Sequence, residues 1–139
     1  MSVDFSTKIL QLKEEIDREL SKIDLSGISA ELAQPMRFSL NAKAKRLRPI
    51  LVLIVGENLG ASRKNLMPAA LAVEIMHTFT LVHDDIMDND TIRRGQQTVH
   101  VKWNVNTAIL TGDALMALAF RTLMQTKSEQ VNQIGTHFS

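Results

Sequence analysis

The chain has 139 residues, of which 45% are hydrophobic and 22% charged, and its formal net charge is +1. This composition is typical of one folded domain with a buried core, and the low charge argues against a general nucleic-acid binder. The absence of cysteine excludes disulfides and thiolate metal sites. The N-terminus does not resemble a signal peptide, and Pro68, Glu74 and His77 interrupt the apolar stretches. We therefore expect a cytoplasmic protein without a transmembrane segment.

Two amphipathic helices are predicted in the first third of the chain. Between Phe5 and Ile23, apolar residues recur at spacings of three and four, with charged residues on the opposite face, and Gly27 ends the pattern. A second helix is expected over residues 30–44, with Pro35 near its N-terminal turn. Its apolar face would carry Leu32, Met36 and Leu40. We expect both helices to serve packing.

A basic segment precedes the third predicted helix. Lys45, Arg46 and Arg48 stand before Pro49, which is well suited to the first turn of a helix. Cations there oppose the helix dipole, but a diphosphate bound there would be stabilised by the cations and by free backbone N–H groups. The alternative is a solvated basic turn. Periodicity leaves open whether the apolar run at residues 50–55 is a strand or a helix, and the proline at its start favours a helix.

The next predicted helix, Met67 to Met87, is apolar until its acidic carboxyl end. Asp84 and Asp88 stand one turn apart on one face, where their like charges destabilise the helix unless a cation neutralises them. Hard divalent cations with oxygen ligands, such as Mg²⁺, do this best. His77 lies about two turns earlier on the same stripe. The alternative is a solvated helix end, but acidic residues there also oppose the dipole.

Two arginines follow in the loop. Asn89 and Asp90 favour a turn, and Gly95 permits backbone conformations that other residues avoid. We expect this turn to bring Arg93 and Arg94 back toward the carboxylates. Carboxylates that bind Mg²⁺, beside arginines that bind phosphate, predict a site for a substrate with two or more phosphate groups.

The remaining residues predict one more long helix. Residues 98–103 are partly β-branched and are expected to be extended. A helix should begin with Asn106 or Thr107 as its N-cap, and apolar residues cover much of its circumference. Asp113, in the middle of this helix, is expected to support the site by hydrogen bonding. From Thr126 the sequence becomes polar.

Three segments together resemble the trans-isoprenyl diphosphate synthases. Residues 84–88 read Asp-Asp-Ile-Met-Asp, which resembles the family's first Asp-Asp-x-x-Asp motif. Residues 93–95 resemble its Arg-Arg-Gly, and residues 45–49 resemble its Lys-Arg-x-Arg-Pro. The resemblance implies an all-α antiparallel bundle of the isoprenoid synthase type, of which residues 1–139 form the N-terminal part. Members continue for about as long again and have a second aspartate-rich motif, so we expect a fragment or a partner chain that supplies the rest.

The resemblance also implies a reaction, in which an allylic diphosphate is ionised and condensed with isopentenyl diphosphate to a C15 to C20 prenyl diphosphate in isoprenoid biosynthesis. Asp84 and Asp88 would bind Mg²⁺ ions that bridge the allylic diphosphate. Asp85 would assist them, and Arg93 would add positive charge.

Isopentenyl diphosphate would be held by a group of cations from three segments, by resemblance Lys45, Arg48, His77 and Arg94. Arg93 would also bind substrate, at the allylic diphosphate. Lys43 and Ala44 stand where the family usually has glycines. This departure is expected to weaken or rearrange diphosphate binding.

Product length, by the same resemblance, depends on the residues four and five positions before the first aspartate, Thr80 and Phe79. A bulky aromatic roughly 7.5 Å along the helix axis from the aspartate would stop elongation early. The alternative for Phe79 is an ordinary core aromatic.

Other readings of the chain remain open. It could be a noncatalytic diphosphate-binding subunit of a heteromeric synthase. It could also be a metal-dependent phosphohydrolase in which His83 and Asp84 bind metal, with His77 and His100 as further ligands. For a synthase we expect a homodimer, or a heteromer with a chain that supplies the missing half.

Overall fold

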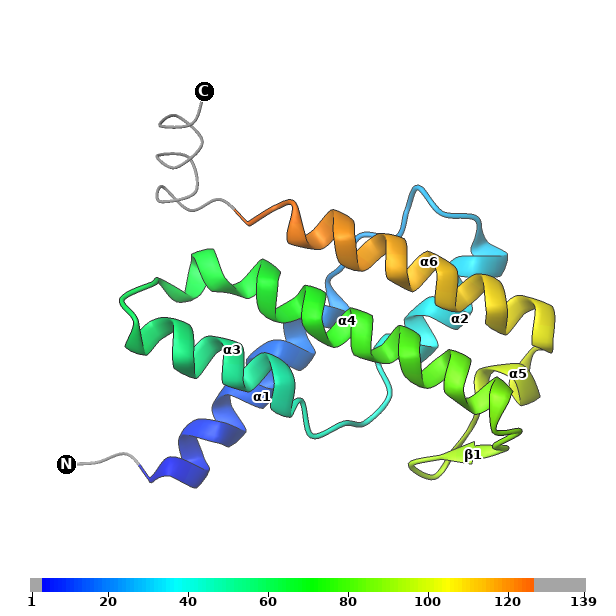
Figure 1. Ribbon diagram of the computed structural model, residues 1–139, viewed down its shortest axis with the longest axis horizontal. Helices are drawn as coiled ribbons and strands as arrows, with labels where there is room; N and C mark the ends of the chain where they lie inside the picture. Colours follow the sequence, from blue (N-terminus) through cyan, green and yellow to red (C-terminus); the bar gives the residue numbers. More distant parts are fainter. Residues whose placement is uncertain (1–3, 127–139) are drawn as a thin grey trace.

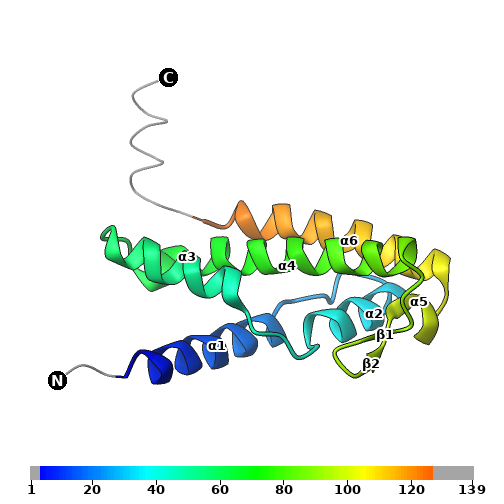
Figure 2. The same ribbon diagram turned by 60° about the horizontal axis from the view of Figure 1, so that its bottom comes forward.

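A computed structural model of the protein describes residues 4–126. Its elements in chain order are α1 (Phe5–Ser21), α2 (Ala30–Leu40), α3 (Leu47–Asn58), α4 (Arg63–Met87), β1 (Ile92–Arg93), β2 (Gln96–Gln97), α5 (Val99–Lys102) and α6 (Val105–Leu123). Figure 2 shows two layers, with α3, α4 and α6 in one and α1 and α2 in the other. The all-α prediction is therefore confirmed. The polar stretch after Thr126 lies outside the described residues.

Helix α4 is the centre of the molecule, with α3 along one side and α6 along the other (Figure 1). It begins four residues earlier than predicted, because the Ser62 hydroxyl caps it by accepting a hydrogen bond from the Asn65 amide at 3.3 Å. An 18-residue window of this helix has a mean hydropathy of 1.3, so the helix is long and apolar enough to cross a membrane. The expectation that no stretch qualifies is thus wrong for α4. Core helices of soluble proteins meet the same criterion, and α4 packs in the core here.

The predicted amphipathic faces meet in one core between the layers. Helix α1 contributes Leu12, Ile16 and Leu20, and the other helices contribute Met36, Leu40, Ile50, Leu53, Ile75 and Leu115, all almost fully buried. Phe5 was expected on the buried stripe, but it is 67% exposed because it is the first residue of α1, at the edge of the bundle.

Several boundaries differ from the predictions because of local caps and tertiary packing. Helix α2 ends at Leu40, four residues early, and Pro35 is buried inside it rather than in its first turn. The chain at residues 98–103 was expected to be extended but contains the helical turn α5, whose Val99 is buried in the core. Helix α6 starts earlier than predicted, because Asn104 caps it by accepting from the Thr107 amide at 2.7 Å.

Two helices keep apolar side chains in solvent. On α3 they recur every fourth residue, and α6 has a larger set; together they are Leu47, Leu51, Val55, Val105, Ile109, Leu110, Met116, Phe120 and Leu123. The described helices therefore leave apolar faces uncovered. Such faces commonly mark a surface that another polypeptide covers.

Candidate functional site

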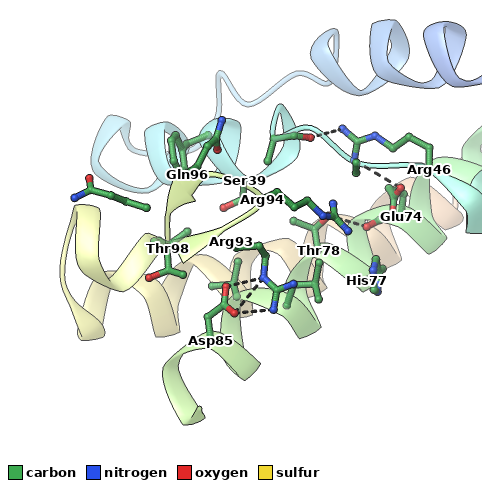
Figure 3. Close-up of a pocket in the computed structure, with 17 residues that line it drawn as sticks. Ser39, Arg46, Glu74, His77, Thr78, Asp85, Arg93, Arg94, Gln96 and Thr98 are labelled. Carbon is green, nitrogen blue, oxygen red and sulfur yellow. Dashed lines mark hydrogen bonds and ion pairs between the residues drawn. The ribbon is translucent and has the colours of Figure 1, made fainter. Parts of the chain in front are cut away.

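A tight hairpin after α4 brings two arginines to the site. Asn89, Arg94 and Gly95 have left-handed backbones, with φ of 54°, 52° and 79°. Arg94 and Gly95 form the turn between β1 and β2, which pair with Arg93 opposite Gln96. The chain reverses direction at this turn, as predicted, and carries the arginines back beside α4 (Figure 3).

Asp85 and Arg93 form a bidentate ion pair at the base of this hairpin. The guanidinium donates from Nη2 to Oδ1 at 2.7 Å and from Nε to Oδ2 at 2.9 Å (Figure 3). The Asp85 side chain is only 5% exposed, and its hydrogen bond raises the pKa of Arg93 above its usual range. Asp85 therefore acts on the site through the arginine that it holds.

Asp84 and Asp88, the predicted metal ligands, are exposed at the carboxyl end of α4. Among residues 4–126, no group of three or more histidine, aspartate or glutamate side chains forms a metal-binding cluster. Mg²⁺ is commonly held by one or two carboxylates together with substrate phosphates and water. Two exposed carboxylates one turn apart fit an ion whose coordination a diphosphate completes.

A group of cations, Arg48, Arg93 and Arg94, lies near His77 of α4. Arg48 Nη1 lies 3.3 Å from His77 Nε2, and since a guanidinium can only donate, the imidazole accepts. Arg94 anchors to the Lys43 carbonyl at 3.1 Å. Burial lowers the pKa of His77, and the charges of Arg48, Arg94 and Arg93 lower it further. The positive charge gathered here would be neutralised by a bound anion.

This lowered pKa predicts an acid-dependent loss of stability. Since the folded state binds the His77 proton less readily than the unfolded state, the free energy of unfolding should fall as pH drops below about 6.5. His77→Asn should lose less stability than the wild type between pH 7.5 and pH 5.5 in urea titrations. Parallel pH profiles for the two proteins would contradict the assignment.

The segment before α3 differs from the expectation in one respect. Lys45 and Arg48 are exposed, and Lys43 and Ala44 have ordinary backbones. The left-handed residue here is Arg46, with φ of 57°. The backbone therefore does not require glycine at positions 43 and 44, and their effect on binding stays a prediction.

Arg46 is a buried residue that the sequence analysis counted among the cations of a basic turn. It donates to Asp17 Oδ1 at 2.7 Å and to the Leu40 and Ala42 carbonyls, and its Nη1 lies 3.6 Å from Glu74 Oε2. Burial raises the pKa of Glu74, while Arg46 opposes that shift. An isolated glutamate inside the apolar sequence of α4 is the signal that could have predicted a buried cation beside it.

An apolar groove of about 480 Å³ lies beside these cations. Helices α4 and α6 form its walls, and Arg48 and His77 also line it; the other lining residues are Ala72, Val73, Met76, Thr80, Ala119, Phe120 and Leu123. Thr80, one of the two predicted floor residues, lines the groove. Phe79 instead packs edge-on against the His83 ring, with centroids 4.8 Å apart.

The histidines of the phosphohydrolase alternative are not gathered into a metal site in residues 4–126. His83 Nε2 lies 3.1 Å from the Ile109 carbonyl and 3.7 Å from Asp113 Oδ1. Asp113 was expected to support the site by hydrogen bonding, but its side chain is 57% exposed and its distance of 3.7 Å from His83 is too long for a hydrogen bond.

Comparison with known proteins places this arrangement in a family. The family model described as polyprenyl synthetase matches residues 29–138. The chain is 48% identical over 101 residues to a geranylgeranyl diphosphate synthase of Methanosarcina mazei, covering 73% of this chain and 31% of that protein. It is 40% identical over 134 residues to a farnesyl diphosphate synthase of Haemophilus influenzae, covering 93% and 45%.

Solved structures agree. A crystal structure of a geranylgeranyl pyrophosphate synthase superposes with a TM-score of 0.81 at 40% identity, covering 99% of this chain and 41% of the other. The chain thus spans less than half the length of these relatives. The chain belongs to the polyprenyl synthetase family.

Proposed function

We propose that this chain provides the part of a prenyl diphosphate synthase that binds both diphosphates, for condensation of an allylic diphosphate with isopentenyl diphosphate. The observation that carries the proposal is the arrangement on α4: exposed Asp84 and Asp88 at its end, and His77 with Arg48 at an apolar groove further back. The groove suits a hydrocarbon chain, and the charged groups suit the phosphates. The names of the relatives support a C15 or C20 product in isoprenoid biosynthesis.

In this proposal Asp84 and Asp88 would hold Mg²⁺, which when bound neutralises the charge of the allylic diphosphate. Arg93, fixed by Asp85, places further positive charge beside that leaving group. The allylic C–O bond breaks with its electron pair on oxygen, giving an allylic cation and diphosphate.

Isopentenyl diphosphate is held by Lys45, Arg48, His77 and Arg94. Its double bond attacks the allylic cation, which forms the new C–C bond and moves the positive charge to the isopentenyl carbon. Loss of a proton to the released diphosphate then restores a double bond. The protein orients the reactants and stabilises charge during these steps.

The exposed apolar side chains of α6, including Ile109, Leu110 and Phe120, support a second polypeptide at this face. We propose a homodimer, or a heteromer with a chain that supplies further parts of the synthase.

The function can be tested with the purified chain, Mg²⁺, radiolabelled isopentenyl diphosphate and geranyl diphosphate. Prenyl transfer predicts labelled C15 to C20 product and release of one diphosphate for each label incorporated. Release of inorganic phosphate without consumption of isopentenyl diphosphate would instead indicate a phosphohydrolase. Saturable binding of both substrates without turnover would indicate a diphosphate-binding subunit.

The length of the prenyl product should change when the side chains at positions 79 and 80 are changed. Thr80→Phe places a ring where the groove is lined by a small side chain, so the product from geranyl diphosphate should shorten toward C15, the result of one condensation. Phe79→Ala removes the predicted stop and should lengthen the product. Chromatography of the dephosphorylated alcohols measures both changes, and Leu51→Ala, on the outer face of α3, serves as a control. Unchanged product lengths in both Thr80→Phe and Phe79→Ala would refute the predicted role of these two residues in chain length.

A further inference from the structure

We propose that Arg46 is a positioning residue for the diphosphate site: through its buried contacts it fixes Lys45 and Arg48 relative to α4, without touching substrate itself. The inference rests on the proposed function of this site. It assigns separate tasks to the three cations of one short segment.

Arg46 is enclosed by three helices and a loop. Its side chain is 4% exposed, and its guanidinium joins Asp17 of α1 and the carbonyls of Leu40 and Ala42 at the end of α2. It also faces Glu74 of α4 (Figure 3). The Nε and Nη2 donors are directed at Asp17 and the two carbonyls, and Nη1 lies 3.6 Å from Glu74, so the guanidinium is held by contacts within the protein.

Two arginines at the start of α3 contact α4, one through a buried contact and one through an exposed contact. Arg46 faces Glu74, while Arg48, two residues later, faces His77, about one turn further along α4. The start of α3 is thus attached to α4 by two contacts. The Arg46–Glu74 contact is buried, and the Arg48–His77 contact is at the surface. Movement of Arg46 would carry Arg48 away from His77, because only Leu47 separates the two arginines.

The backbone conformation of Arg46 also supports a positioning role for this residue. Arg46 is the N-cap residue of α3 and has a left-handed conformation, which is uncommon for residues other than glycine and costs free energy. The contacts of the guanidinium hold this conformation. The resulting turn leaves the neighbouring Lys45 and Arg48 exposed while Arg46 is buried.

Arg63 offers a matched comparison elsewhere in the fold. It also joins α1 and α3 to α4, through Glu15 and Glu57, but at the opposite end of α3 and with a side chain 41% exposed. A general effect of losing an arginine that links these helices should therefore appear in Arg63→Met. An effect on diphosphate geometry should appear only when Arg46 is changed.

The test is calorimetric titration of inorganic pyrophosphate without divalent metal, which isolates the cation site from the aspartates. Arg46→Lys keeps the charge but loses the fork that reaches several partners. We expect about tenfold weaker binding in Arg46→Lys, since orienting partners behind metal ligands change affinity by about 10- to 100-fold. Arg63→Met should bind like the wild type.

A second variant separates position from charge. The double variant Arg46→Met/Glu74→Gln removes one charge of each sign, so it leaves the net charge of the cluster unchanged. Positioning predicts that it also binds weakly, whereas a purely electrostatic role predicts wild-type affinity. Thermal melts establish that each protein is folded, and if the double variant does not fold, Arg46→Lys alone decides.

These binding measurements distinguish a failure of the positioning role of Arg46 from a failure of the proposed function. If the wild type does not bind pyrophosphate, the diphosphate site itself is wrong. If the wild type binds and folded Arg46→Lys binds equally well, the positioning role is wrong. Equal weakening in Arg63→Met would also overturn it, because the effect would then follow general helix packing.

Discussion

Arg93→Met should destabilise the fold by about 3 kcal/mol, at the lower end of the range for breaking a buried ion pair because Arg93 itself is partly exposed. The substitution leaves the Asp85 carboxylate buried without the guanidinium that donates three hydrogen bonds to it. Urea unfolding at pH 7 measures the loss. The hairpin should also release from the end of α4, with weaker binding of an allylic diphosphate.

Arg94→Met is the matched control, because Arg94 is the next residue of the same hairpin, is exposed and pairs with no carboxylate within residues 4–126. Its effect on stability should stay within about 0.5 kcal/mol. The double variant Arg93→Met/Asp85→Asn should recover part of the lost stability, since no buried charge is left unpaired, but not the diphosphate binding. Equal unfolding free energies for the two single variants would disprove the role of the pair.

Gly112→Ala should cost about 1 to 3 kcal/mol through steric conflict between α6 and α4. A Cβ added at Gly112 would overlap Nε2 and Cδ2 of the His83 ring. This ring has little room to move, because it packs against Phe79 and contacts the Ile109 carbonyl. Alanine in a free helix position would instead gain about 1 kcal/mol over glycine.

Thermal and urea unfolding of two further variants test whether the steric conflict with His83 causes the loss of stability in Gly112→Ala. Gly27→Ala is the control, because nothing lies within 4 Å of a Cβ at that position. Gly112→Ala/His83→Ala should be more stable than the sum of the two single effects, since the smaller residue removes the conflict. A gain in stability for Gly112→Ala alone would show that the helices separate without cost.

The sequence predicted the helical architecture well, because the periodic apolar residues of α1, α2 and α4 are locally decisive. It could not predict α5, since Val99 gains its stability from burial in the core rather than from local propensity. Nor could it identify the first residue of α6, because Asn104, Asn106 and Thr107 are all acceptable caps, and only the fold shows that Asn104 is used.

The sequence could not show how the predicted site residues pair. Successive helical residues point about 100° apart, so Asp85 faces the pocket while Asp84 lies on the exposed side of α4. The motif shows three aspartates without showing which one is buried. In the same way, Lys45, Arg46 and Arg48 are three similar cations in sequence, and only the partners brought by α1 and α4 make the middle one structural.

The most direct test of the account is calorimetric titration of geranyl diphosphate into the chain with Mg²⁺ and with EDTA, using the wild type and Asp84→Asn/Asp88→Asn. The exposed Asp90→Asn in the following loop is the control. The account predicts saturable binding by the wild type and Asp90→Asn that requires Mg²⁺, and its loss in the double variant. The same affinity in EDTA, or in Asp84→Asn/Asp88→Asn, would contradict a metal-assisted diphosphate site at the end of α4.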